Sequence, residues 1–154
     1  MMRLASVSVD LDSLGHYCRI QGLPLSLLDE RARNLVATVA IPRFLELFTA
    51  AKTSATFFVI AADLDEPLAR ALRDAHANRV ELANHSHTHD YAISRWSADD
   101  ALADLTRAHA LIREHTAVAP VGFRAPGYTL SPALLAAVQT LGYRYDSSAY
   151  PAAP

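Results

Sequence analysis

Short apolar runs alternate with longer amphipathic stretches along the 154-residue chain. The short runs are rich in β-branched and aromatic residues and end at polar residues, which is typical of buried strands. The clearest of them, residues 55–60 (Ala-Thr-Phe-Phe-Val-Ile), is apolar enough to be covered on both faces. The pattern predicts five strands, at residues 4–9, 55–60, 79–83, 121–123 and 143–145.

The first long stretch between these runs, residues 27–51, predicts one or two helices. Pro42 is expected in the first turn of the second helix, where a proline removes only an N–H group that would lack a partner. Four apolar residues of this segment are expected to face the core: Phe44, Leu45, Leu47 and Phe48.

Three further helices are predicted downstream. One covers residues 67–77, one follows an N-cap at Ser97, and one opens at Ser131-Pro132 and stops at Gly142. Strands and helices therefore alternate along the whole chain, which predicts an α/β fold with a parallel sheet or barrel.

Composition narrows the class of protein. The length suits a single domain over residues 1–154, and 51% hydrophobic with 19% charged residues favours a packed core over disorder. A net charge of -2 and a sequence pI near 6.4 argue against nucleic-acid binding, which usually needs a basic face. The single cysteine, Cys18, excludes a disulfide framework and is interpreted as a small apolar filler. No run resembles a signal peptide or a membrane span, so the sequence as written predicts a cytoplasmic protein.

Polar residues whose side chains can bind a metal or take part in catalysis follow the predicted strands. In parallel α/β folds the chemistry lies where the strands end, so these segments are expected to meet. They are Asp10-Leu11-Asp12 after the first strand, Asn84-His85-Ser86-His87-Thr88-His89-Asp90 after the third, Arg124-Ala125-Pro126-Gly127 after the fourth and Asp146-Ser147-Ser148 after the last.

The histidine segment predicts a metal site. Three of the seven histidines fall within five residues, and His85 and His89, four residues apart, can reach one ion from a tight loop. A carboxylate from another segment would complete a three-ligand site with room for water. The segment lacks the glutamate of a zinc-protease helix. A polar loop of unrelated histidines is the alternative interpretation.

The flanking segments are less specific when each is taken alone. Asp10 and Asp12 share a face of an extended chain and could divide the roles of metal ligand and base, although a helix N-cap or a solvated turn would look the same. Arg124 could pair with a carboxylate, and Gly127 would let a backbone N–H approach a ligand. A surface turn is the alternative for this third segment.

The four segments in this order resemble the NodB-homology polysaccharide deacetylases, which are carbohydrate esterase family 4-like proteins. The resemblance spans residues 7–148. It implies a distorted, incomplete (β/α) barrel that lacks its C-terminal strands. It also implies a metal-dependent hydrolase that removes N-acetyl or O-acetyl groups from an amino sugar or polysaccharide.

The resemblance assigns roles to individual residues. Asp12, His85 and His89 would hold one divalent metal ion, zinc first and cobalt or nickel as alternatives. Asp10 would be the general base, with Arg124 as its charge partner. The remaining assignments concern support of the site: Gly127 as an oxyanion donor through its backbone N–H, Ser86 as a brace of the histidine loop, and Asp146 as a residue behind the site.

Three departures from the family pattern are visible. The usual proton donor is a histidine on a later strand, and none follows before Pro154. We expect the donor and the last strands on a C-terminal continuation or a partner chain, with His87 or His16 as the fallback donor. Leu11 separates two aspartates that are adjacent in many members. Gly127 stands where an aromatic residue is common, so substrate stacking at this position is in doubt.

Two more positions could line the substrate cleft. His16, with Tyr17, is expected in a long loop after the first strand. Trp96 could act as a lid or a sugar platform, and ordinary packing at the entry of a helix explains it equally well.

Two other functions stay open: a C–N hydrolase of a cyclic ureide or imide, as in allantoinase-like relatives, and an inactive glycan-binding relative. Because the three metal-binding positions are intact, the sequence favours the deacetylase.

Overall fold

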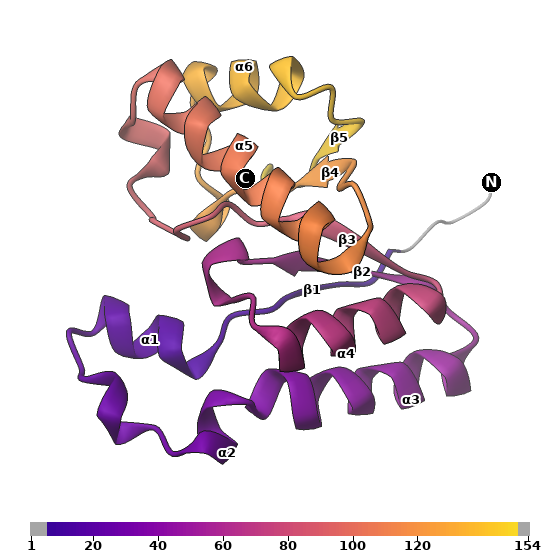
Figure 1. Ribbon diagram of the computed structural model, residues 1–154. Coiled ribbons are helices and arrows are strands. Elements are labelled where there is room, and N and C mark those ends of the chain that lie inside the picture. The colour runs from indigo at the N-terminus through magenta and orange to yellow at the C-terminus, as the bar shows by residue number, and fades with distance from the viewer. Residues whose placement is uncertain (1–5, 151–154) are drawn as a thin grey trace.

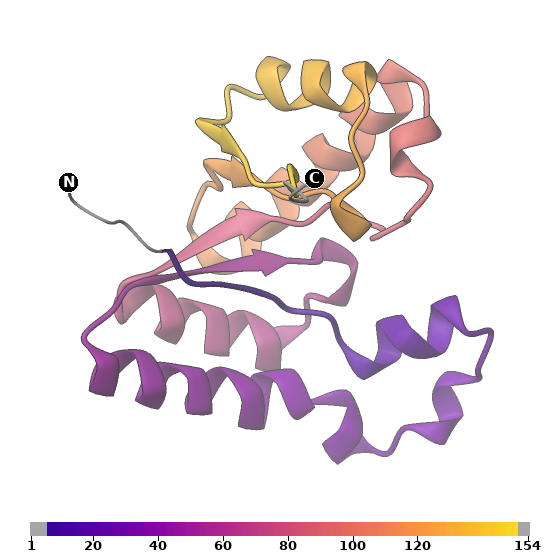
Figure 2. The same ribbon diagram turned by 180° about the vertical axis from the view of Figure 1, so that it is seen from behind.

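The computed structural model describes residues 6–150, which form five parallel strands in the order β1-β2-β3-β4-β5 with helices packed beside them (Figure 1). The strands are β1 Ser8–Asp10, β2 Ala55–Val59, β3 Val80–Asn84, β4 Gly122–Phe123 and β5 Tyr145–Asp146. Because every pairing is parallel and neighbouring strands are consecutive in sequence, all carboxyl ends lie at one edge, toward α1 in Figure 2. The predicted α/β fold of partial-barrel type is confirmed.

The three middle strands differ from the prediction by one residue at one or both ends, and the first and last strands differ more. Leu4 and Ala5 of the first predicted strand lie outside the described residues, and the strand there begins at Ser8. The last strand covers residues 145–146 instead of 143–145. Tyr143 cannot join the sheet ladder because its backbone N–H donates to the carbonyl of Val138, which closes the preceding helix.

Four long helices follow the predicted pattern: α3 Ile41–Ala51, α4 Glu66–Ala77, α5 Ala98–Thr116 and α6 Pro132–Thr140. The side chains of Asp65, Ser97 and Ser131 cap the last three, each accepting a hydrogen bond from a backbone N–H of the first turn. Within residues 6–150, no helix is long and apolar enough to cross a membrane.

Residues 27–51 are more irregular than one or two helices. They contain a short helix, α2 Glu30–Arg33, and a π-helical segment, Val36–Ala40, that runs directly into α3. Pro42 lies in the first turn of α3 as predicted. The prediction for Leu47 is wrong, because its side chain is on the solvent side of α3 and is 58% exposed.

The segment after β1 is a helix, α1 Leu14–Ile20, where the sequence predicted a long loop. Ser13 caps it, because its Oγ accepts a hydrogen bond from the backbone N–H of His16 at 2.9 Å. His16 and Tyr17 therefore lie on a helix that stands at the carboxyl ends of the strands. The described residues also contain four short 3-10 turns, at Leu25–Leu27, Ala61–Asp63, Ile93–Arg95 and Pro126–Tyr128.

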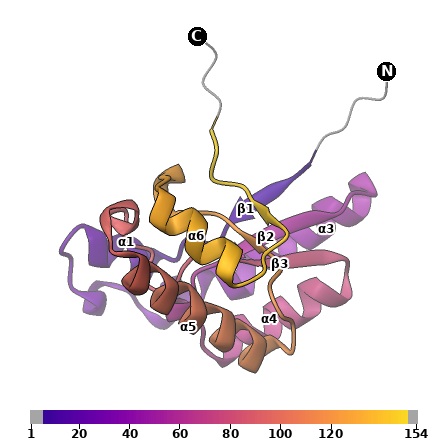
Figure 3. The same cartoon turned by 90° about the horizontal axis from the view of Figure 1, so that it is seen from above.

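Two apolar clusters hold the layers together. The first joins β1, β2 and β3 to α3, α4 and one side of α5, with Phe57, Leu72 and Leu82 almost fully buried. The second joins β4, α5 and α6 through residues such as Phe123 and Leu134. Figure 3 shows α5 and α6 lying together, with α3 well apart from them, next to β1 and β2. Burial of each side chain of this size contributes roughly 1.5–3 kcal/mol to the free energy of folding. This packing holds the strands, and therefore the strand ends, in fixed positions.

The close contact between Gly122 and Tyr145 gives a test of this packing. A Cβ atom at position 122 would overlap the Tyr145 ring, whose hydroxyl donates to Glu81 on β3 at 2.5 Å. We expect Gly122→Ala to lower the free energy of unfolding by about 1–3 kcal/mol, because the ring must move. Gly15→Ala is the matched control, since a Cβ there meets no atom closer than 3.5 Å. Equal urea midpoints for the two variants would contradict the packing.

Candidate metal centre

The strand ends bring three potential ligands together. One ligand atom from each of Asp12, His85 and His89 lies within 4.8 Å of the others. Asp12 Oδ1 is 3.5 Å from His89 Nε2 and 4.0 Å from His85 Nε2, and the two Nε2 atoms are 3.0 Å apart. These are the three residues that the resemblance assigns to the metal.

The burial of these atoms fits a bound cation. Asp12 Oδ1 is buried and has no hydrogen-bond partner among the described residues, and both imidazoles are only 2% exposed. A buried carboxylate oxygen without a partner is costly, and a divalent ion would satisfy it. Two imidazoles and one carboxylate are a donor set that zinc and other first-row ions accept.

The tautomer of His85 is set by its other ring nitrogen. Nδ1 lies 2.7 Å from the backbone carbonyl of Arg124, which can only accept, so Nδ1 carries the proton. Nε2 then presents its lone pair to the cluster, as a metal ligand requires. Burial lowers the pKa of His85, and burial together with the charges of His85 and His16 lowers the pKa of His89 to about 3. Both rings are therefore neutral near pH 7.

The histidine loop has a tight conformation that its own polar atoms stabilise. Ser86 and His89 both have positive φ angles, 67° and 54°. The Oγ of Ser86 accepts from the backbone N–H of His89 at 2.9 Å, and Asn84 Oδ1 accepts from the N–H of Ser86 at 2.7 Å. The two histidines thus approach each other across a loop, as the sequence predicted, and not along a helix.

Asp104 supports the same loop and was missed in the sequence. It lies on α5, is 7% exposed, and accepts from the backbone N–H of His87 at 2.8 Å and of Thr88 at 3.2 Å. The Thr88 hydroxyl donates to it as well, at 3.0 Å. A signal was present, because Asp104 shares a helix face with Ala101 and Ala108, and a charged residue on an apolar face needs a partner.

Arg124 connects the third segment to Asp10. Its Nη1 donates to Asp10 Oδ1 at 2.6 Å, and its guanidinium lies 4.0 Å from the centre of the Phe58 ring. Nη2 donates to the hydroxyls of Ser8 and Ser147 at 2.9 and 2.8 Å. Asp10 Oδ2 accepts no hydrogen bond from the part of the chain that the structure describes, and it lies 3.8 Å from His85 Nε2, beside the candidate metal ligands.

The other predicted site residues of the third and fourth segments lie around Arg124. Gly127 is in the Pro126–Tyr128 turn with a φ angle of 62°. Asp146 does not reach the cluster through any hydrogen bond or ion pair of the described residues. Its Oδ1 accepts from the N–H of Ser148 at 2.6 Å, and Ser148 Oγ accepts from the N–H of Ala125 at 2.8 Å. Asp146 thereby stabilises the loop that carries Gly127.

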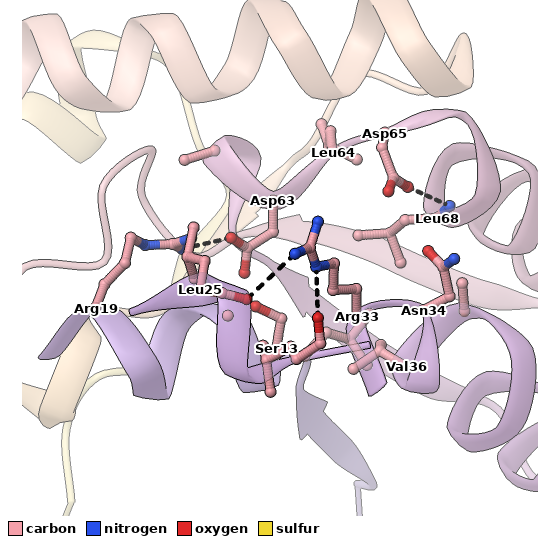
Figure 4. A pocket seen from close by; sticks show the side chains of 15 residues that line it. Ser13, Arg19, Leu25, Arg33, Asn34, Val36, Asp63, Leu64, Asp65 and Leu68 are labelled. Atoms are coloured by element: carbon pink, nitrogen blue, oxygen red, sulfur yellow. Dashed lines mark hydrogen bonds and ion pairs between the residues drawn. The ribbon is translucent and has the colours of Figure 1, made fainter. Parts of the chain in front are cut away.

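Helix α1 forms a wall of the centre. The His16 ring is 1% exposed and lies edge-to-face against His89, with centroids 4.2 Å apart, so His16 is buried and does not line an open loop. Tyr17 Oη donates to Asp12 Oδ2 at 3.3 Å. An ion pair of 2.5 Å between Arg19 and Asp63 ties α1 to the turn after β2 (Figure 4). The cavity of about 290 Å³ beside this pair contains none of the three candidate ligands.

Trp96 lies apart from the metal ligands. It packs against the second apolar cluster, beside Ile93, and lines a cavity of about 430 Å³ with His87 and Arg107. None of the candidate ligands lines this cavity. This placement agrees with packing at the entry of α5, one of the two alternatives that the sequence left open.

A family model described as polysaccharide deacetylase matches residues 34–145. The chain belongs to this family. The match includes His85, His89 and Arg124, whereas Asp10 and Asp12 lie before it. In this chain, the two aspartates are linked to the matched region by the contacts of Asp10 with Arg124 and of Asp12 with the two histidines.

Solved structures of this family have the same fold. A putative polysaccharide deacetylase from Mycobacterium smegmatis is 22% identical, with 92% of this chain and 49% of that chain covered and a TM-score of 0.76. A family 4 acetyl xylan esterase from Clostridium thermocellum, in complex with a cobalt ion, is 21% identical, with coverages of 86% and 53% and a TM-score of 0.64. A CE4 family pseudoenzyme from Bacillus anthracis is 17% identical, with coverages of 92% and 41% and a TM-score of 0.68.

The chain thus spans about half the length of the solved structures that it matches. A comparison with curated protein sequences found no match. At identities of 17–22% the structural likeness supports the fold, and the chemistry must be argued from the residues of this chain.

Asp104 provides a test of the histidine loop. We expect Asp104→Asn to lower the free energy of unfolding by about 1–3 kcal/mol, because one amide oxygen cannot replace both carboxylate acceptors. Metal affinity should fall roughly tenfold, since the loop that aims His85 and His89 loosens. Urea unfolding and competition with a chelating dye measure the two effects. Asp74→Asn, at an exposed position of α4, is the control, and equal behaviour of both variants would count against the role of Asp104.

Proposed function

We propose that this polysaccharide deacetylase family member is a metal-dependent hydrolase that removes an acetyl group from an amino sugar or a polysaccharide. One divalent ion, zinc in the first instance, would be held by Asp12, His85 and His89. The observation that carries the proposal is the buried Asp12 Oδ1, which has no hydrogen-bond partner within residues 6–150 and faces two imidazole Nε2 atoms, with the Asp10–Arg124 pair beside them.

The residues around the ion can divide the work of amide or ester hydrolysis. A divalent ion polarises a carbonyl and makes a water more acidic. Asp10 would take the proton from the attacking water at Oδ2, since Arg124 binds Oδ1 and Oδ2 lies on the side of the candidate ligand His85. The backbone N–H of Gly127 would donate to the oxyanion that forms when water adds to the carbonyl.

The leaving amine needs a proton from an acid, and neither fallback donor is well placed. His87 lines the cavity with Trp96 and Arg107, and His16 is 1% exposed behind His89. Burial lowers the pKa of both histidines, which leaves them mostly neutral near pH 7. We therefore propose that the proton donor is neither His16 nor His87.

Activity against a panel of substrates separates this function from its alternatives. N-acetylated oligosaccharides should release acetate, and a chelator should stop the release. Hydrolysis of a cyclic ureide without deacetylation would favour the allantoinase-like function. Binding of oligosaccharides with no turnover would favour an inactive glycan-binding protein, a class that the name of the Bacillus anthracis pseudoenzyme makes relevant.

The metal ligands are tested by metal content. We expect the wild-type protein to hold about one divalent ion per chain and His85→Ala or His89→Ala to lose it, because two ligands bind such an ion weakly. His76→Ala, at an exposed position of α4, should keep the wild-type content. Elemental analysis that finds the same metal content in all four proteins would refute the ligand assignment.

The role of Asp10 is tested by separating metal binding from turnover. Asp10→Asn should retain the ion, since Asp10 is outside the ligand set, and should lower kcat by roughly 10²–10⁴ because an amide cannot accept the proton. Asp12→Asn should weaken metal binding as well. Steady-state kinetics with an active form of the protein measure the first effect. A near-normal kcat for Asp10→Asn would show that another group is the base.

A further inference from the structure

Gly127 lacks a side chain at the position where the ring of Tyr91 packs. A Cβ atom at 127 would lie 2.7 Å from Tyr91 Cδ1 and 3.2 Å from Cε1, closer than side chains tolerate. The φ angle of 62° at Gly127 also disfavours any other residue. The backbone of the third segment and the ring of Tyr91, which follows the histidine loop, are therefore in direct contact.

Tyr91 is anchored on one side and open on the other. Its ring lies edge-to-face against His89, with centroids 5.3 Å apart, and 6.4 Å from the ring of His16. The residue is nevertheless 45% exposed. An exposed aromatic ring fixed between a candidate metal ligand and the candidate oxyanion donor, Gly127, is poorly explained by core packing.

We infer that Tyr91 is a substrate-binding residue whose exposed ring contacts the sugar ring that carries the acetyl group. This inference rests on the proposed function, because it needs the acetyl carbonyl between the ion and Gly127. A substrate held there has Tyr91 as a neighbouring apolar surface. The ring thus supplies the aromatic contact that residue 127, a glycine, cannot make.

The chemistry of tyrosine suits a pyranose ring. Sugars present an apolar face of C–H groups beside hydroxyls, and a tyrosine offers an apolar ring with a polar tip. Tyr128, which follows Gly127, is 41% exposed and provides a second aromatic ring next to the same turn.

Binding measured without turnover tests this role. In the Asp10→Asn background, which should keep the ion and block hydrolysis, the affinity for N-acetylchitotetraose is measured by titration calorimetry. Adding Tyr91→Ala should weaken binding roughly tenfold, and adding Tyr91→Phe should change it by less than about threefold because the ring is kept. Leu135→Ala on α6, an apolar residue that is 46% exposed, is the control and should have no effect.

The outcomes distinguish the inference from the function beneath it. Unchanged affinity in Tyr91→Ala, with oligosaccharide still bound in the Asp10→Asn background, would overturn the role of Tyr91 and leave the proposed function standing. Absence of oligosaccharide binding in that background would overturn both. Metal content is measured for each variant. Weaker oligosaccharide binding by a variant with full metal content then reports the lost contact and not a disrupted metal centre.

Discussion

The buried guanidinium of Arg124 is the interaction on which the rest of the centre depends. It pairs with Asp10 after β1, lies over Phe58 of β2, and binds Ser147 after β5. Its own backbone carbonyl accepts from His85 after β3. A cation that is 8% exposed requires such partners, since a buried charge without them is strongly disfavoured. Through its side chain and its backbone carbonyl, Arg124 thereby links segments that follow or belong to four other strands and sets their spacing at the edge of the sheet.

Further polar groups, behind the candidate ligands, hold the histidine loop by hydrogen bonds. Asn84 lies at the end of β3, where its amide accepts from Ser86 and donates to the carbonyl of Leu105 and the hydroxyl of Tyr143. Asp104, on α5, accepts a hydrogen bond from the backbone N–H of His87 in the same loop. The histidine loop is thus held by groups from β3, from α5 and from the segment after α6, which limits the reorganisation needed when a ligand binds.

The candidate metal centre has two parts: a base, formed by the strand ends that carry the ligands, and a rim, formed by helix α1 and Tyr91. The base consists of short strands and charged pairs, whereas the rim is aromatic: Tyr17 contacts Asp12, and Tyr91 contacts His89 and Gly127. Structures with this fold include a pseudoenzyme and a mutant of it described as having restored activity. Fold and activity are therefore separable in this architecture.

The sequence alone determined the strand–helix alternation, the N-caps at Ser97 and Ser131, and the family, because these depend on local periodicity and on short motifs after strands. It also pointed to the histidine pair, since spacing within one loop is a local property. The structure alone decided that His16 is buried on a helix, that Tyr143 closes α6 before β5 begins, and that Leu47 faces solvent. It alone placed Asp104 under the histidine loop and Tyr91 on Gly127. These features depend on contacts between residues far apart in the chain or on the exact rotation of a helix, and packing, not local propensity, determines both.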